Sequence, residues 1–282
     1  MSSRAGSSGA ILVTVLWSLA LLSALGVAAS TTFRGFAGIV GVERDRVRAQ
    51  ALLTAGIEVV AGMLSRLGDT PLVQQEAEVR LRGGLVAVQL TDEGGRIDIG
   101  KAPPEVLAAL FRAVGASNPE ALATRLAAWR KPRNGSDEPT SQQETAFASL
   151  RALQQAAGIE PDMVAALAPL ATVFGNETVN PITAPAAVLA ALPEVDRRGL
   201  SSFLAARARG SADAGRLSAL LGPGGRYLQL TPTRAVSVRL VATLRDGYAE
   251  SAHAIIVILA EDTQPYRLLA WDAVTSAGDE RP

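Results

Sequence analysis

Side chains able to perform covalent or acid–base chemistry are scarce in this 282-residue chain. There is no cysteine, which excludes disulfides, thiolate metal sites and cysteine nucleophiles. The single histidine, His253, lies two residues after Ser251 in an alternating stretch, so both side chains would share one face of a strand. A Ser-His-Asp triad would depend on this one imidazole, and an ordinary place in a sheet is the role we expect for it. We therefore predict no enzymatic activity and no catalytic residue.

Groups that could bind phosphate or metal are also few. The acidic pairs Asp92-Glu93 and Glu261-Asp262, and the glycines of 222–225, fall at predicted turns, where such residues are common. No phosphate-binding loop or dinucleotide fingerprint is present. Basic and acidic residues balance at 27 each, so the basic excess typical of a nucleic-acid-binding protein is missing. We expect no cofactor and no nucleic-acid partner.

The element that stands out is an uncharged stretch from Ala10 to Ala29. At about 1.5 Å per residue it is long enough to cross a hydrocarbon core of about 30 Å. Three interpretations fit it: a secretion signal cut before Ser30, a plain membrane anchor, or a leader cut between Gly9 and Ala10. Only the third leaves a whole apolar helix at the start of a mature protein.

Residues 42–67 predict an amphipathic continuation of this helix. Between the two helical parts, glycine recurs at every third position from 35 to 41, and each glycine lowers helix propensity by about 1 kcal/mol relative to alanine. This spacing predicts a bend or partial unwinding. The apolar positions that we expect to pack against partner helices are Leu52, Val59, Val60, Met63 and Leu64.

The rest of the chain changes period twice. Residues 76–99 alternate apolar and polar side chains and predict a three-stranded meander. From Pro103 to about Gly222 the pattern is helical, and from Tyr227 alternation returns and predicts about four strands, with a hairpin turn at 245–248. Strands on both sides of a helical block indicate one sheet with a helical domain inserted into it.

Two segments of the helical block nearly repeat one another. "APPEVLAAL" at 102–110 and "APAAVLAAL" at 184–192 agree at seven of nine positions, each with a proline in the first helical turn. Both are similar to the first half of a helix-hairpin-helix DNA-binding motif. After the second copy, Glu194 and Asp196 stand where backbone amides would have to meet phosphate. A membrane-anchored helix-hairpin-helix protein is therefore only the alternative function.

Four segments, taken in order, are distinctive: the leader ending at Gly9 before an apolar helix with Trp17, "LTDEGGRIDIGKAPPEVL" at 90–107, "LRALQQAAGIEPDMVAALAPLATVFGNETVNPITAP" at 150–185, and "YRLLAW" at 266–271. Together they resemble the type II secretion minor pseudopilin family called general secretion pathway protein K. The likeness covers almost the whole mature chain, and "VNPITAP", within the third segment, is its most specific part.

The resemblance implies an α+β, pilin-like fold. A long N-terminal helix would pack on a small antiparallel sheet, with a large all-helical domain inserted between strands. The expected divisions are a leader at 1–9, the long helix at 10–67 (10–29 transmembrane and assembly part, 42–67 amphipathic part), first strands at 68–100, the helical domain at 101–222 and the remaining strands at 223–282.

The resemblance also implies processing of the chain. A prepilin peptidase would cut after Gly9, and the new amino terminus at Ala10 would be methylated. The fifth residue after this cut is Thr14, where most pilin-like subunits carry a glutamate that pairs with the amino terminus of the subunit ahead. A subunit with nothing ahead of it does not need the carboxylate. Thr14 therefore predicts a position at the filament tip.

By the same resemblance the chain is a non-enzymatic subunit of the bacterial inner membrane, single-pass, with its C-terminal part in the periplasm. The expected partners are I- and J-type minor pseudopilins in a tip complex, the prepilin peptidase, and, more remotely, exoproteins or the outer-membrane secretin. Some family members bind calcium, but Asp137 and Glu138 here are adjacent and lack the alternating spacing of a calcium loop. Calcium is accordingly a weak expectation.

Overall fold

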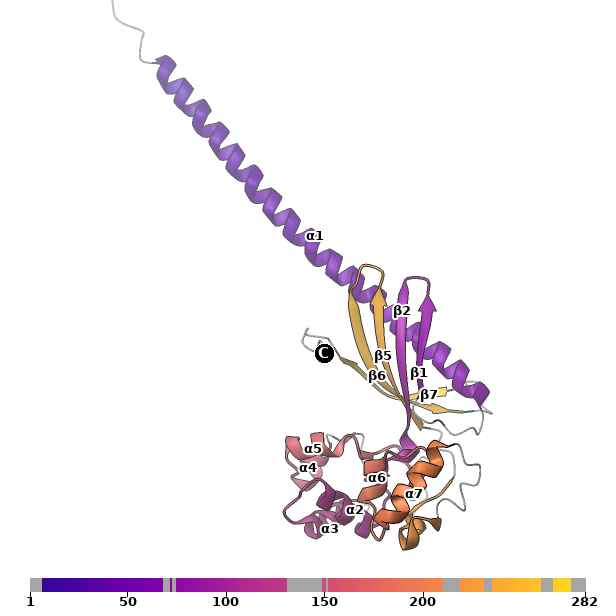
Figure 1. Ribbon diagram of the computed structural model, residues 1–282. Helices are drawn as coiled ribbons and strands as arrows, with labels where there is room; N and C mark the ends of the chain where they lie inside the picture. Colours follow the sequence, from indigo (N-terminus) through magenta and orange to yellow (C-terminus); the bar gives the residue numbers. More distant parts are fainter. Residues whose placement is uncertain are drawn as a thin grey trace, which may run out of the picture.

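The longest element of the computed structural model is helix α1 (Ser7–Leu67), whose 61 residues span about 90 Å at 1.5 Å per residue (Figure 1). The structure describes residues 7–67, 72, 75–130, 149–150, 152–209, 219–230, 235–259 and 266–274. The C-terminal part of α1 lies against a sheet, and a helical domain follows at the end of the sheet that is remote from the N-terminal part of α1 (Figure 1).

The predicted bend in α1 is wrong, because the helix is unbroken through Gly35, Gly38 and Gly41. A glycine lowers helix propensity, but it keeps both the N–H and the C=O that the helical hydrogen bonds need. Sharp kinks usually require a proline or an inserted group, and α1 contains no proline. The two predicted helical parts therefore form one rod.

The sheet is antiparallel and five-stranded, in the order β1-β2-β5-β6-β7. The helical domain is inserted between the neighbours β2 and β5, so the predicted α+β fold with an inserted helical domain is confirmed. The strands are β1 (Gln75–Leu81), β2 (Gly84–Asp92), β5 (Ala235–Leu244), β6 (Ala249–Ile258) and β7 (Tyr266–Val274).

One face of the sheet is covered by α1. Gly56 permits this close approach, because a Cβ at that position would come within 3.0 Å of the side chains of Val86 and Leu240. The predicted hairpin turn joins β5 to β6, and Gly247 adopts the positive φ of 90° that such a turn requires. The main apolar side chains of this core are Leu53, Ile57, Val60, Leu64, Val86, Val88, Val238, Leu240, Ala254 and Ile256.

Two of the predicted strands are wrong. Asp92 ends β2 by accepting a hydrogen bond from the Gly94 amide at 2.9 Å, which turns the chain away from the sheet in the short helix η1 (Glu93–Gly95). The expected third strand of the meander becomes β3 (Ile97–Asp98), paired in parallel with β4 (Ala171–Thr172) in the helical domain. After the insertion, Tyr227 ends a 3-10 helix instead of starting a strand, so three strands rather than four follow in the described residues.

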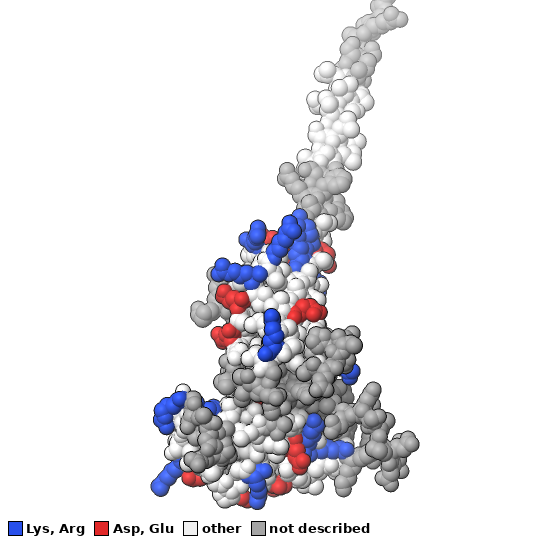
Figure 2. Space-filling view, turned by 90° about the vertical axis from the view of Figure 1, so that its right-hand side faces the viewer, with Lys and Arg blue, Asp and Glu red and all other residues white. Residues whose placement is uncertain are grey.

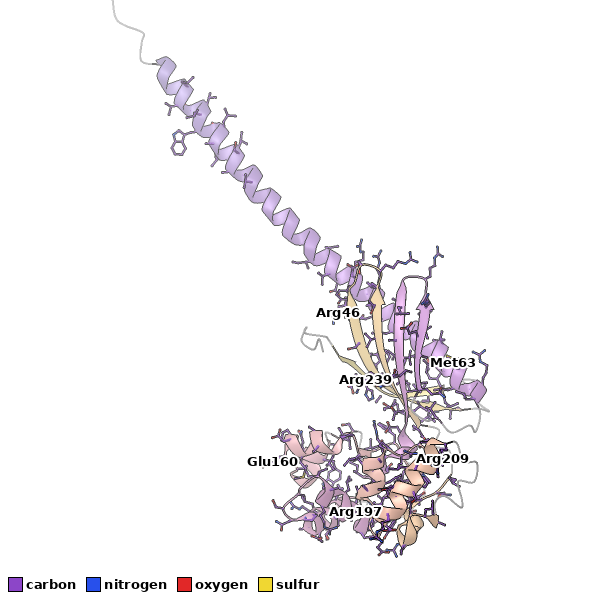
Figure 3. The ribbon with its side chains drawn as sticks, in the orientation of Figure 1. Arg46, Met63, Glu160, Arg197, Arg209 and Arg239 are labelled. Atoms are coloured by element: carbon purple, nitrogen blue, oxygen red, sulfur yellow. The ribbon has the colours of Figure 1, made fainter. Side chains whose placement is uncertain are left out.

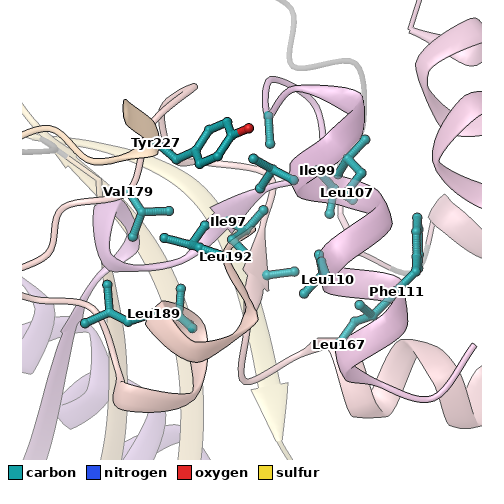
Figure 4. Packing of buried hydrophobic residues seen from close by; sticks show 14 of the residues in the cluster. Ile97, Ile99, Leu107, Leu110, Phe111, Leu167, Val179, Leu189, Leu192 and Tyr227 are labelled. Carbon is teal, nitrogen blue, oxygen red and sulfur yellow. The ribbon is translucent and has the colours of Figure 1, made fainter. Parts of the chain in front are cut away.

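The helical domain has a hydrophobic core of its own, separate from the core under the sheet (Figure 4). Ile97, Ile99 and Tyr227 belong to this core, so the packed unit extends a few residues beyond 101–222 at both ends. Its helices are α2 (Pro104–Ala113), α3 (Pro119–Trp129), α4 (Ala152–Ala157), α5 (Pro161–Leu167), α6 (Ala186–Ala191), α7 (Arg197–Ala208) and the 3-10 helix η2 (Gly222–Tyr227).

The near-repeat seen in the sequence is also a structural repeat. Before α2, the amide of Ala102 donates to the carbonyl of Asp98 at 2.8 Å, and before α6 the amide of Ala184 donates to the carbonyl of Asn180 at 3.0 Å. In each copy the second helix ends in a partly buried arginine whose guanidinium donates back to the turn before the first helix.

These two arginines bind equivalent atoms. The Nη1 of Arg130 lies 2.6 Å from the carbonyl oxygen of Ala102, and the Nη1 of Arg207 lies 2.6 Å from that of Ala184. Arg207 also donates to the carbonyls of Pro181 and Ile182. In each helical pair the guanidinium group ties the end of the second helix to the turn before the first, and we call this contact an arginine clamp. Without the clamp, these partly buried carbonyls would lose a charged hydrogen-bond donor.

Two of the family-like motifs meet where the helical domain joins the sheet. The hydroxyl of Thr183 donates to Asp92 at 2.8 Å, and the amide of Asn180 donates to the carbonyl of Gly94 at 2.8 Å. Gly95 lies so close that a Cβ there would come within 2.8 Å of the Thr183 backbone. The segments at 90–107 and 150–185 therefore form one hydrogen-bonded junction.

Polar contacts also fasten α1 to strands β6 and β7 of the sheet. The Tyr266 hydroxyl on β7 donates to Glu58 at 2.7 Å, and Arg46 lies 3.5 Å from Glu250 on β6. Loss of hydration and the adjacent carboxylate raise the pKa of Tyr266 to about 12, because both disfavour the phenolate.

We predict that Arg207→Gln lowers the free energy of unfolding of the full chain in detergent by about 1–3 kcal/mol, since three carbonyl oxygens lose their charged donor. The matched control is Arg209→Gln, an exposed arginine two residues further on, which should change stability by less than about 0.5 kcal/mol. Denaturant titration measures both. Equal losses in the two variants would contradict the clamp.

A second prediction concerns Tyr266. Its folded pKa of about 12 exceeds the ordinary 10.0, so its contribution to stability is complete below pH 10 and is lost as the pH rises toward 12. Burial also raises the pKa of Tyr248, so the test uses a Tyr248→Phe background, in which absorbance at the phenolate band should show a late titration that disappears when Tyr266→Phe is added. A late titration that survives Tyr266→Phe would show that the assigned bond is not its cause.

Candidate assembly helix

The N-terminal half of α1 carries a long run of exposed apolar side chains. Ten large apolar side chains lie between Leu12 and Val27, and each is 53% to 73% exposed. They point to all sides of the helix, so no single face is reserved for packing on the chain's own domain (Figure 3). A helix that is apolar all round belongs in a membrane or among other helices.

The two halves of α1 differ in whether they could span a membrane. In the described residues, the one segment that is long and apolar enough to cross a bilayer is Ile39–Leu67, with Leu12–Val27 as a shorter apolar segment. The segment Ile39–Leu67 carries the charged residues of 43–48 and packs on the sheet, so it is the core helix of the folded domain. The exposed half around Leu12–Val27 is the part that fits a single-pass anchor.

The predicted processing and assembly positions all lie on this half. Gly9 and Ala10 fall in the first turns of α1. Thr14 lies one turn further, its side chain is exposed, and its carbonyl accepts a hydrogen bond from the Ser18 hydroxyl at 2.8 Å. No carboxylate is present in this uncharged segment, which runs without a charged residue from Ala10 to Phe33.

The five positions expected to pack against partner helices divide into two groups. Leu52, Val60 and Leu64 are buried beneath the chain's own sheet, so the structure gives them an intramolecular role. Val59 is half-buried and Met63 is 39% exposed, and these two stay as predicted partner contacts (Figure 3). Amphipathic spacing identified a packed face but not the surface against which it packs.

His253 occupies an ordinary position in the sheet. Its Nε2 lies 2.6 Å from the Ser237 hydroxyl on the neighbouring strand rather than beside Ser251. Burial and, secondarily, the nearby Arg239 lower its pKa, so the imidazole is neutral at neutral pH. With Glu93 and Asp272 it lines a pocket of about 260 Å³ between the sheet and the helical domain.

A metal centre is not among the candidates that the structure offers. Within the described part of the chain, no group of three or more histidine, aspartate or glutamate side chains could hold a metal ion. Asp137 and Glu138, the residues considered for calcium, lie outside the described residues.

Comparison with known proteins gives a match at the level of fold. Neither a protein-family profile nor a curated protein matches the chain. A chain of the crystal structure of the GspK-GspI-GspJ complex from the type 2 secretion system of enterotoxigenic Escherichia coli superposes with a TM-score of 0.57 at 13% identity. The alignment covers 83% of this chain and 98% of that chain. The long helix, the antiparallel sheet and the inserted helical domain therefore make this a protein with the GspK-like pseudopilin fold.

Proposed function

We propose that this chain is a minor pseudopilin of the type II secretion system, which caps the tip of the pseudopilus and helps to nucleate its assembly. In this role α1 is first a membrane anchor and then one of a bundle of helices in the filament. The filament would in turn support export of folded proteins across the outer membrane. The role is structural and involves no catalysis.

The position of the helical domain carries the proposal of a tip location. The sheet lies beside the C-terminal half of α1, and the helical domain extends beyond it, away from the apolar half (Figure 1). In a filament of parallel helices, a subunit added ahead would need the space past the end of α1. A bulky domain in that space is compatible with the last subunit and hard to repeat along a shaft.

Thr14 supports the same location on independent grounds. A carboxylate buried in a membrane or helix bundle is costly unless it is paired, and a pairing partner comes only from a subunit ahead. Threonine avoids that cost and gives up the ion pair. The exposed position of Thr14 on the apolar half of α1 is where such a pair would form in other subunits.

The processing and partners follow from this role. A prepilin peptidase would cut between Gly9 and Ala10, the new terminus would be methylated, and the folded part would lie in the periplasm. The structural neighbour is a complex with GspI and GspJ, which supports I- and J-type minor pseudopilins as the partners of this chain. The chain would join them through the exposed half of α1.

The DNA-binding alternative finds no support in the geometry of the second repeat. A helix-hairpin-helix motif binds phosphate through free amides at the start of its second helix. Here the carboxylate of Asp196 already accepts hydrogen bonds from the amides of Arg198 and Gly199, at 3.3 and 3.0 Å. Glu194 stands in the turn with a positive φ of 59° and adds a second negative charge.

The proposal is tested by producing the tagged full chain together with a type II secretion system and its shaft pseudopilin. Gold labelling should find the chain at one end of each pseudopilus, and mass spectrometry should find a mature terminus at methylated Ala10. A Thr14→Glu variant separates the two arguments: a label that spreads along the shafts assigns the restriction to Thr14, and a label that stays at one end assigns it to the bulk of the helical domain.

Two results would contradict different parts of the proposal. Label repeated along the shafts would exclude the tip role but leave a pseudopilin. A mature terminus at Ser30 would remove the assembly helix and exclude the pseudopilin role altogether.

A further inference from the structure

Arginine side chains gather at the end of the sheet from which the apolar half of α1 emerges (Figure 2). The pairing of Gly84 with Leu244 places the β1–β2 and β5–β6 turns at the same end, and the ion pair between Arg46 and Glu250 places α1 beside them. All six arginines are exposed. We call them the arginine collar: Arg44, Arg46 and Arg48 on α1, Arg80 and Arg82 at the first turn, and Arg245 at the second.

The collar carries an excess of positive charge. Its helix arginines are partly neutralised, because Arg44 and Arg48 each lie 3.4 Å from Asp45 and Arg46 pairs with Glu250. The turn arginines are different: within the described part of the chain, Arg80, Arg82 and Arg245 form no ion pair. A group of unneutralised guanidinium ions is suited to a partner that presents several anions.

The collar follows directly after an apolar surface. Ile39, Val40 and Val42 are 60% to 68% exposed, and the charged residues begin at Glu43. From Leu12 to Val42 the helix is about 46 Å long at 1.5 Å per residue, which exceeds a hydrocarbon core of about 30 Å. A helix longer than the core is accommodated by tilting.

The tilt decides whether the collar reaches the lipid. A helix that enters a hydrocarbon core of about 30 Å at Leu12 and is tilted by about 40° emerges from it near residue 38. Arg44 then lies about 7 Å above the core, among the headgroups. At an average tilt of about 20°, Arg44 would instead lie about 15 Å above the core, beyond the headgroups.

We propose that the arginine collar binds anionic phospholipid headgroups and holds the unassembled subunit tilted, with its folded part against the membrane surface. Each basic side chain near an anionic surface contributes about 1 kcal/mol, so the three unpaired turn arginines supply a sizeable attraction. The inference rests on α1 being a membrane helix, but it does not depend on the tip role. An acidic surface on another protein is the competing partner, and the test below includes it.

The test uses the full chain reconstituted in phosphatidylcholine vesicles with or without phosphatidylglycerol. Because the chain has no cysteine, Thr243→Cys at the collar end of β5 provides a single site for a fluorescent donor, and labelled headgroups are the acceptor. Anionic lipid should bring the donor closer to the labelled headgroups by several ångströms, since Arg44 comes about 8 Å nearer the core between the two tilts. The approach should be reversed by salt, and inorganic phosphate at equal ionic strength should act no more strongly than chloride.

Charge-matched variants identify the surface. A triple collar variant should abolish the approach of the donor to the headgroups; it combines Arg80→Gln, Arg82→Gln and Arg245→Gln. A triple control variant on the helical domain should leave that approach intact; it combines Arg197→Gln, Arg198→Gln and Arg209→Gln. An unchanged distance in anionic vesicles, or equal losses in both triple variants, would overturn the proposal. The proposal would also be overturned if the collar variant kept its response to anionic lipid but no longer co-purified with partner pseudopilins. That result would identify an acidic protein surface as the partner of the collar. Flotation with neutral vesicles separately tests whether α1 is a membrane anchor.

Discussion

The structure depends on one constraint: in the described part of the chain, the apolar surface of α1 is covered along only half of its length. Leu53, Val60 and Leu64 are sealed under the five-stranded sheet. Leu16, Trp17 and their neighbours are more than half exposed, and no described residue of the sheet or the helical domain covers them. Burying such side chains is worth about 1.5–3 kcal/mol each, so the exposed half must be covered by lipid or by other helices. Membrane insertion and filament assembly are two ways to satisfy the same requirement.

The helical domain adds a second hydrophobic core. Its packing is closed by the clamps of Arg130 and Arg207, and it is joined to the sheet through the short contacts around Asp92 and Thr183. Asp92 and Glu93 are almost fully buried at this junction, and loss of hydration raises the pKa of both. A buried, hydrogen-bonded junction fixes the insertion relative to α1, as a capping domain would require.

Much of this arrangement could be predicted from the sequence. Hydrophobic period distinguishes the strands around Val86 and Val238 from the helical block between them, and the turn chemistry at Gly247 defines a hairpin. What could not be predicted depends on contacts between distant residues. The residues around Thr183 in the sequence do not indicate that it bonds Asp92, and those around Arg207 do not indicate that it bonds the turn before α6. In the same way, the sequence around Ile97 does not show that it pairs with a strand in the helical domain.

The same limit applies to the candidate site. An uncharged stretch and the departure at Thr14 are visible in the sequence, because composition and position alone define them. The role of Leu52, Val60 and Leu64 is not visible in the sequence. Helical periodicity shows that one face of the helix is packed, but it does not show whether the chain's own sheet or another subunit covers that face. The arginine collar was missed for a similar reason: Arg46, Arg82 and Arg245 come together only in the folded sheet.

The N-terminal half of α1 should be covered by lipid before assembly, and spin labels on single cysteines can test this. Labels introduced in turn between Leu12 and Val27 of the reconstituted chain, which has no native cysteine, can be exposed to oxygen and to a water-soluble relaxation agent. If lipid covers the helix, oxygen should relax all of these labels and the aqueous agent none, whereas a label at Arg44 should show the reverse. Aqueous accessibility at or around Trp17 would contradict it.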